Sequence, residues 1–248
     1  LEFSNDSRLL ASCARDGALL WPLDASGGRM RHLEIGGDYY CYGLGFAPDG
    51  RDVAMTSPFM GAYLVPLGGG PARRILDFSG QRLAPMPVAF DRAGRTVAVA
   101  PMYAAAAPDL LLHVLDLESG VRRAFPMRPE GPGNGYASSA YSLKFLGDGR
   151  LLMGGPGGLR LWDLASGTAE RWLWGETRFA AADTDHTGRT IVALVGELSP
   201  NRLRLLDPEL LVLGLDGRVV RRIASHGNAL TATLAVDAAG RILVTGDA

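Results

Sequence analysis

The sequence of 248 residues lacks an excess of either charge. Its 25 lysines and arginines are matched by 26 aspartates and glutamates, and the formal net charge is −1. Nucleic acids and anionic membranes attract strongly basic surfaces, so this balance predicts neither as a partner. Lysine is almost missing, since Lys144 is the only one in the chain.

Long apolar runs and cysteines are also scarce. No stretch reaches the roughly 18 consecutive apolar residues that cross a bilayer, so we expect no membrane insertion in this segment. The two cysteines, Cys13 and Cys41, are too few for a disulfide scaffold. We therefore expect two reduced, buried thiols in a cytoplasmic protein, because intracellular reductants keep thiols reduced.

Glycine and proline, by contrast, are plentiful, with 33 and 15 residues, and a turn motif that ends in arginine repeats along the chain. Its arginines are spaced by 43, 44, 55, 39 and 52 residues, a mean of about 47. That period is close to the roughly 40–45 residues of a β-propeller blade. The copies of the motif are Asn5-Asp6-Ser7-Arg8, Pro48-Asp49-Gly50-Arg51, Arg92-Ala93-Gly94-Arg95, Gly147-Asp148-Gly149-Arg150, His186-Thr187-Gly188-Arg189 and Ala238-Ala239-Gly240-Arg241.

Each of these turns stands between two runs that are typical of β-strands. Apolar and polar residues alternate before the turn, as in 141–145, and short runs rich in β-branched residues follow it, as in 190–194. A third apolar run and a fourth, outer run come next, as in 114–118 and 121–124. The repeated order predicts an all-β fold, a β-propeller of four-stranded antiparallel blades.

The period predicts a single propeller domain with about six blades in this segment, the last incomplete, and six or seven in the full protein. Because the chain starts inside an innermost strand and the last blade lacks its outer strands, we expect it to be cut from a longer polypeptide. One strand is ambiguous, since either 202–206 or 210–215 could be the third strand of its blade. The expected blades are 1–36, 37–80, 81–133, 134–175, 176–226 and a partial blade at 227–248.

The cycle of Phe46-Ala47-Pro48-Asp49-Gly50-Arg51, a short strand and then Leu161-Trp162-Asp163-Leu164-Ala165-Ser166-Gly167 resembles the WD40-repeat family over essentially the whole chain. That family holds its blades with a tetrad of Asp, Ser or Thr, Trp and His. The tetrad is poorly kept here, since blade four has Pro156-Gly157-Gly158 in place of the turn aspartate, and we expect apolar packing to compensate. The resemblance, to the degenerate bacterial type, implies tetrad-like structural roles for Ser12, Asp16, Trp21, Trp162 and Asp163.

Residues that could perform chemistry do not converge in this arrangement. The inner strand ends at the channel mouth carry no carboxylate, and Asp183 and Asp185 are interpreted as solvated turn residues. The glycine-rich segment 154–158 lacks the Lys-Ser/Thr of a phosphate loop, and the turn arginines are expected to form solvated surface pairs. We predict no catalytic residue, no metal and no cofactor.

The histidines fall in different blades and layers: His32, His113, His186 and His226, the last where the family places its tetrad histidine. The inner strand ends carry Gly43, Pro85, Tyr141, Ala180 and Thr231.

These observations favour a non-catalytic scaffold that binds a protein or peptide. The resemblance implies a sensor or regulatory domain of a multidomain bacterial signalling protein such as a Ser/Thr kinase, and the partner could be a domain of the same polypeptide. The alternative is a propeller enzyme of the lactonase or hydrolase kind, or the gating propeller of a peptidase. Loops of variable length predict the binding face, although their side chains could instead plug the ring mouth. The candidate binding residues are Tyr39, Tyr40, Phe59, Met60, Tyr103, Tyr136 and Trp174.

Overall fold

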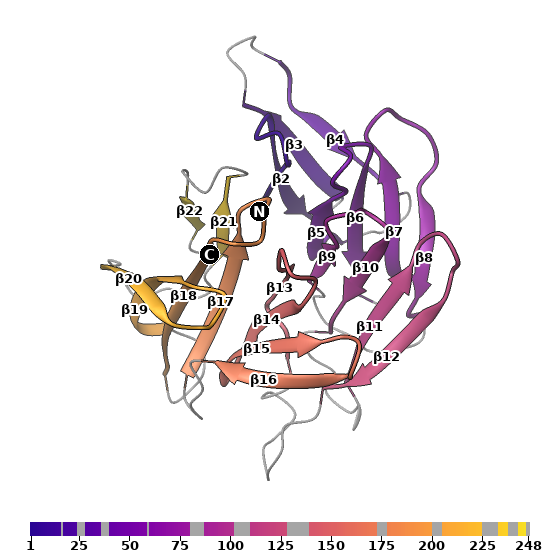
Figure 1. Ribbon diagram of the computed structural model, residues 1–248. Helices are drawn as coiled ribbons and strands as arrows, with labels where there is room; N and C mark the ends of the chain where they lie inside the picture. The colour runs from indigo at the N-terminus through magenta and orange to yellow at the C-terminus, as the bar shows by residue number, and fades with distance from the viewer. Residues whose placement is uncertain are drawn as a thin grey trace.

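The architecture is that of an all-β propeller, seen in a computed structural model (Figure 1). Every regular element among the described residues is a β-strand, and no helix occurs there. The structure describes residues 1–15, 17–23, 28–35, 40–58, 60–79, 87–101, 110–127, 139–172, 178–199, 205–224, 233–237 and 243–246.

Five four-stranded antiparallel sheets form the blades, and in each the strands follow one another in chain order. Blades one to three comprise β1 (Glu2–Phe3), β2 (Leu9–Ala14), β3 (Gly17–Pro22), β4 (Arg31–Leu33), β5 (Gly43–Phe46), β6 (Asp52–Ser57), β7 (Gly61–Pro66), β8 (Arg73–Asp77), β9 (Val88–Phe90), β10 (Thr96–Val99), β11 (Leu111–Asp116) and β12 (Arg122–Pro126). Blades four and five comprise β13 (Ser142–Phe145), β14 (Leu151–Gly155), β15 (Gly158–Asp163), β16 (Thr168–Trp172), β17 (Arg178–Thr184), β18 (Ile191–Leu198), β19 (Leu205–Leu213) and β20 (Val219–Ala224). The predicted propeller of four-stranded blades is therefore confirmed.

The number of blades differs from the prediction of about six. The described residues form five four-stranded blades, followed by a two-stranded sheet of β21 (Thr233–Val236) and β22 (Leu243–Gly246). Strand β21 contacts β17 of blade five on one side and β1 of blade one on the other. This short sheet therefore lies between the last blade and the first.

The repeated turn motif connects the first two strands of each blade. In blade four, the Asp148 carboxylate accepts a hydrogen bond from the backbone N–H of Arg150 at 3.0 Å, and Gly149 adopts φ +87°. The Arg150 side chain pairs with Asp148 at 2.7 Å and also donates to the carbonyl oxygen of Leu215 in blade five at 3.1 Å. This arginine therefore joins two blades, beyond the solvated pair that the sequence predicts.

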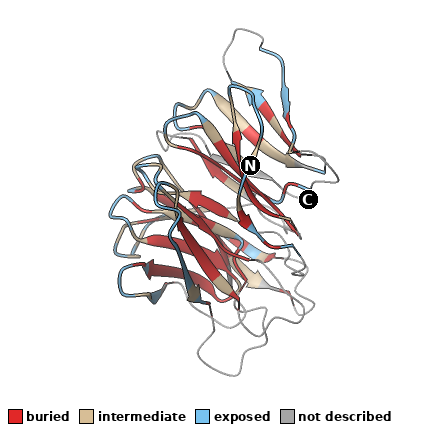
Figure 2. Cartoon of the chain, turned by 90° about the vertical axis from the view of Figure 1, so that its right-hand side faces the viewer, coloured by how far each residue is buried: buried red, intermediate tan, exposed pale blue. Residues whose placement is uncertain are grey.

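The hydrophobic core lies between neighbouring blades. Leu20 and Val53 pack in a cluster shared by blades one and two, and Leu159 and Leu211 pack in one shared by blades four and five. Figure 2 shows the buried residues along the strands and the exposed ones at turns and outer strands. Because the apolar side chains pack between neighbouring sheets, polar groups can meet at the axis of the ring.

The ambiguous segment of blade five forms one long strand. Strand β19 runs from Leu205 to Leu213 and pairs with β18 along its length, with a register shift between Val195 and Glu197. It overlaps both alternatives at 202–206 and 210–215. Within the described residues, 205–206 and 210–213 belong to this same strand, which explains why both are apolar.

Candidate functional site

The innermost strands surround two cavities on the axis of the ring. One has a volume of about 290 Å³ and is lined by turns between first and second strands, including Pro48, Arg92 and His186. The other, of about 350 Å³, is lined by residues at the opposite ends of the innermost strands. Both cavities are lined by Glu2 and Lys144, so one polar group of side chains separates them.

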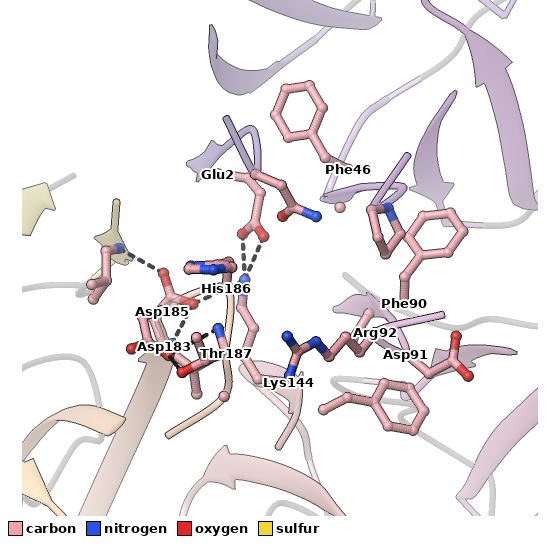
Figure 3. Close-up of a pocket in the computed structure, with 18 of the residues that line it drawn as sticks. Glu2, Phe46, Phe90, Asp91, Arg92, Lys144, Asp183, Asp185, His186 and Thr187 are labelled. Carbon is pink, nitrogen blue, oxygen red and sulfur yellow. Dashed lines mark hydrogen bonds and ion pairs between the residues drawn. The ribbon is translucent and has the colours of Figure 1, made fainter. Parts of the chain in front are cut away.

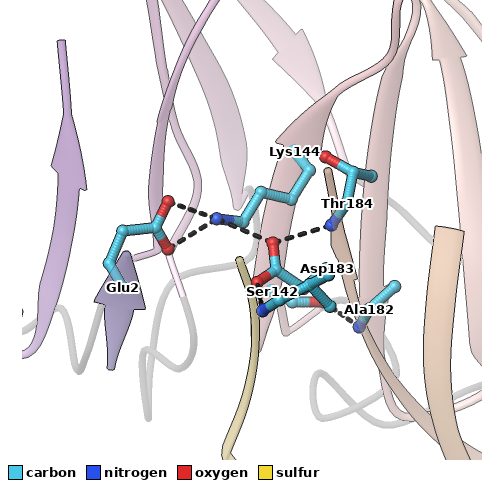
Figure 4. A network of polar contacts seen from close by, with 7 residues as sticks. Glu2, Ser142, Lys144, Ala182, Asp183 and Thr184 are labelled. Atoms are coloured by element: carbon cyan, nitrogen blue, oxygen red, sulfur yellow. Dashed lines mark hydrogen bonds and ion pairs between the residues drawn. The ribbon is translucent and has the colours of Figure 1, made fainter. Parts of the chain in front are cut away.

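That group is an ion network centred on Lys144. The Lys144 ammonium donates to both carboxylate oxygens of Glu2 at 2.5 Å and pairs with Asp183 Oδ1 at 3.0 Å (Figure 4). The other oxygen of Asp183 accepts a hydrogen bond from the backbone N–H of Val236 at 2.7 Å. The network therefore joins blades one, four and five and the two-stranded sheet.

The sequence interpretation of Asp183 and of the channel was wrong. Asp183 is 2% exposed and lies in strand β17, so it is not a solvated turn residue. The residues at the ends of the innermost strands predicted a channel without carboxylates. The channel nevertheless contains the carboxylates of Glu2 and Asp183. A signal was present, because Lys144 is the only lysine and stands in an expected innermost strand, but its partners are distant in sequence.

Burial and pairing act on these groups in opposite directions. Burial alone would lower the pKa of Lys144, but the carboxylates of Asp183 and Glu2 outweigh it and raise that pKa above its usual value. Burial raises the pKa of Glu2, and the neighbouring ammonium of Lys144 offsets this only in part. Lys144 is therefore held as a cation, which makes it a poor nucleophile or base.

The first cavity is rimmed by turns whose polar side chains are used locally (Figure 3). The Asp185 carboxylate accepts hydrogen bonds from the backbone N–H and the hydroxyl of Thr187 at 3.1 and 2.8 Å. Burial would raise the pKa of Asp185, but hydrogen bonds from Thr187, Thr190 and the backbone outweigh it and hold that pKa below its usual value. Asp185 thus stabilises its own turn, as its position predicts.

Two tyrosines line the second cavity, and a third stacks on one of them. Tyr42 and Tyr141 line it and are 48% and 39% exposed. Tyr40, 38% exposed, stacks on Tyr42 with ring centroids 6.5 Å apart, and the Arg15 guanidinium lies 5.6 Å from the centre of the Tyr40 ring. We call Tyr40, Tyr42 and Tyr141 the tyrosine rim.

The two cysteines form a disulfide beside this rim, which corrects the expectation of reduced thiols. Cys13, near the end of β2 in blade one, is bonded to Cys41, which immediately precedes Tyr42 and blade two; their Cα atoms are 5.0 Å apart. Cys13 also lines the second cavity. Two cysteines from adjacent blades thus meet because both stand at the same end of the ring.

Only part of the predicted binding face can be compared with the structure. Tyr40 is exposed, whereas Met60 is half-buried and packs on the cluster that contains Cys41 and Leu44. Tyr42 belongs to the same loop as Tyr40 but is not among the predicted binding residues. Tyr141 was recognised as a channel-mouth residue but not as a binding residue. The remaining candidates lie outside the described residues: Tyr39, Phe59, Tyr103, Tyr136 and Trp174.

The tetrad-like residues are partly connected. The Trp21 indole N–H donates to the Ser12 hydroxyl at 3.0 Å, and Asp16 lies outside the described residues. Trp162 is buried, and its indole N–H has no hydrogen-bond partner among the described residues. The strand register explains this difference, because Met153 in β14 occupies the position that Ser12 has in β2.

Asp163 and the histidines have local roles. The Asp163 carboxylate accepts a hydrogen bond from the backbone N–H of Ala165 at 2.8 Å in the turn after β15. His32 pairs with Glu34 at 3.0 Å, while His113 is buried against Phe78. His226 lies outside the described residues, and within them no three His, Cys, Asp or Glu side chains are grouped as metal ligands.

Comparison with known proteins adds no family assignment. No protein-family model matches this sequence, and no curated protein matches it significantly. Among the described residues there is also no helix of the length and apolar character that spanning a membrane requires.

Proposed function

We propose that this propeller is a non-catalytic scaffold that binds a peptide or protein segment at the tyrosine rim. The observation that carries the proposal is the exposure of Tyr42 and Tyr141 at a cavity of about 350 Å³, with the exposed Tyr40 stacked on Tyr42. Large aromatic side chains are enriched at the energetic centres of protein interfaces, because they bury much apolar area at little entropic cost. A rigid ring that holds them in place favours binding further.

The cavity behind the rim suits a side chain of such a partner. Its walls include Leu44, Val88 and Leu143, and the hydroxyls of Ser12 and Ser142 add polar groups. An apolar side chain inserted there would be removed from water while the partner's backbone contacts the tyrosines. An apolar side chain in a pocket beside exposed aromatic residues is typical of peptide recognition.

The state of the channel groups supports a binding role over an enzymatic one. Lys144 remains an ammonium, and it contacts the carboxylates of Glu2 and Asp183 directly. A propeller hydrolase or lactonase would need carboxylates directed at a substrate or a metal. In the described part of this channel the network instead links blades.

We further propose that the chain is a degenerate member of the WD40-repeat class and regulates an effector domain in a signalling protein. The repeated turn arginine, the four-stranded blades and the hydrogen bond from Trp21 to Ser12 support the class. The regulatory role rests on the resemblance of the sequence alone. Its partner would be a domain of the same polypeptide or a separate protein.

The binding proposal is tested with a peptide probe. Random 12-residue peptides displayed on phage are selected on the 248-residue protein, and a selected peptide is titrated against Tyr40→Ala and Tyr42→Ala. We expect each substitution to weaken binding by about tenfold or more, which corresponds to about 1.4 kcal/mol. Arg51→Ala, on the opposite face and in an exposed pair with Asp49, is the matched control. Equal binding by all variants would refute the proposal.

A further inference from the structure

The disulfide covalently attaches the loop that carries two rim tyrosines to the neighbouring blade. Cys41 stands between Tyr40 and Tyr42 in the chain, and its partner Cys13 belongs to β2 of blade one. Tyr40 and Tyr42 precede the first strand of blade two, which begins at Gly43. The bond therefore fixes this loop across the boundary between two blades.

Hydrogen bonds of the described residues also hold the loop in this position. The backbone N–H of Tyr42 donates to the carbonyl oxygen of Thr56 at 3.0 Å, which attaches the loop to its own blade. Toward blade one, Arg15 donates to the Tyr40 hydroxyl at 3.4 Å, a long and exposed hydrogen bond. Among the described residues, the disulfide is the covalent cross-link between this loop and blade one, beside that hydrogen bond and the contact of Arg15 with the Tyr40 ring.

The disulfide also lies where a small thiol can reach it. Cys41 is buried, but Cys13 is half-buried and lines the cavity of about 350 Å³ whose mouth carries Tyr42 and Tyr141. Thiol–disulfide exchange requires access of a thiolate to one of the two sulfurs. The cavity provides that access from the side on which a partner would bind.

We propose that Cys13 and Cys41 form a thiol-exchange site that regulates the tyrosine rim, an inference that rests on the proposed binding function. The reductant is a small dithiol. Its first thiolate attacks the Cys13 sulfur, and Cys41 leaves as a thiolate and takes up a proton. The second thiol displaces Cys13, which also ends as a thiol, and the dithiol becomes a disulfide. The loop with Tyr40 and Tyr42 is then released from blade one, and the rim loses its fixed geometry.

The first measurement follows the loop itself. Dithiothreitol is added to the 248-residue protein, and single amides are followed by hydrogen exchange in NMR spectra. Exchange of the Tyr42 amide should accelerate about tenfold or more on reduction, because its bond to Thr56 opens when the loop is released. The Ala47 amide, bonded to the Asp52 carbonyl oxygen at the far end of β5, should be unchanged. Unchanged exchange at Tyr42, or equal acceleration at both amides, overturns the proposal.

The second measurement separates this inference from the proposed function. The selected peptide is titrated against oxidised protein, reduced protein and Cys13→Ser, which lacks the bond without any reductant. We expect reduced protein and Cys13→Ser to bind about tenfold more weakly than oxidised protein. Equal affinity in all three, with binding still sensitive to Tyr42→Ala, overturns the exchange site and leaves the binding function standing. Binding that is insensitive to Tyr42→Ala overturns the binding function instead, and regulation of the rim with it.

Discussion

Lys144 and Asp183 form an ion pair at 3.0 Å between adjacent innermost strands, β13 of blade four and β17 of blade five. The same ammonium reaches Glu2 in β1, so one cation serves two carboxylates from different blades. Removing three charges from water carries a large cost, which the mutual attraction of the groups offsets only while the network is complete. The stability of the ring should therefore depend on every member of the network.

Replacing Lys144 by methionine should destabilise the protein strongly. Lys144→Met keeps the length of the side chain but leaves Glu2 and Asp183 without their cation, and the loss should be about 3 kcal/mol or more in the free energy of unfolding. Urea denaturation at pH 7 measures it. The double variant Lys144→Met/Glu2→Gln should recover part of the loss, because one uncompensated charge is removed with the cation.

Lys144→Arg is the matched control for this experiment, since it retains the positive charge at the same position. We expect it to cost about 1 kcal/mol, from the different shape of the guanidinium. If Lys144→Met is as stable as the unchanged protein, the network does not hold the blades together.

His113 should make the protein sensitive to mild acid. Burial, and then the nearby Arg122 guanidinium, lower the pKa of His113 to about 4, and Arg122 donates to His113 Nδ1 at 2.8 Å. The folded-state pKa lies below the unfolded value of about 6.5, so the contribution to stability is complete above pH 6.5. It is lost as the pH falls from 6.5 toward 4, by at most about 3 kcal/mol.

Urea unfolding at pH 7.0, 5.5 and 4.5 tests this dependence. In His113→Gln the slope of unfolding free energy against pH should be reduced in this window, whereas His186→Gln, at an exposed turn residue, should keep it. Equal slopes for His113→Gln and the unchanged protein would show that another group is responsible.

The fold could be predicted because its determinants are local and repeated. A turn such as 147–150 needs a glycine with positive φ and an aspartate that accepts backbone hydrogen bonds, and both requirements are visible in the sequence. The flanking alternation fixes which side of each strand is buried. Copies of the same pattern along the chain then predict four-stranded blades without any long-range information.

The channel network could not be predicted in the same way. Glu2 and Lys144 are 142 residues apart, and only the closing of the ring brings them together. Asp183 stands two residues from the turn residue Asp185, and their different environments depend on which way the strand end faces. The disulfide was missed for a related reason, since Cys13 and Cys41 meet only if adjacent blades place them at the same end.

The disulfide should also stabilise the whole domain. It closes a loop between positions 28 residues apart, and the entropy removed from the unfolded chain corresponds to about 3.6 kcal/mol. Cys13→Ser/Cys41→Ser should therefore unfold at lower urea concentration than the oxidised protein, by about that free energy. Reduced unchanged protein should match the double variant. Equal midpoints for the oxidised protein and the variant would contradict the bond.

A close backbone contact between blades four and five, at Gly147 and Gly188, should tolerate no side chain. The Gly147 N–H donates to the carbonyl oxygen of Gly188 at 3.2 Å, and Gly188 has φ +63°. A Cβ on Gly188 would lie 2.8 Å from the Cα of Leu146, so Gly188→Ala combines backbone strain with a steric clash. We expect a loss of about 3 kcal/mol in the free energy of unfolding, measured with urea.

Gly149→Ala is the control, because Gly149 has φ +87° but no atom within 4 Å of an added Cβ, and it should cost only about 1 kcal/mol. Equal losses at the two positions would show that backbone conformation alone, and not the contact between blades, selects glycine at position 188.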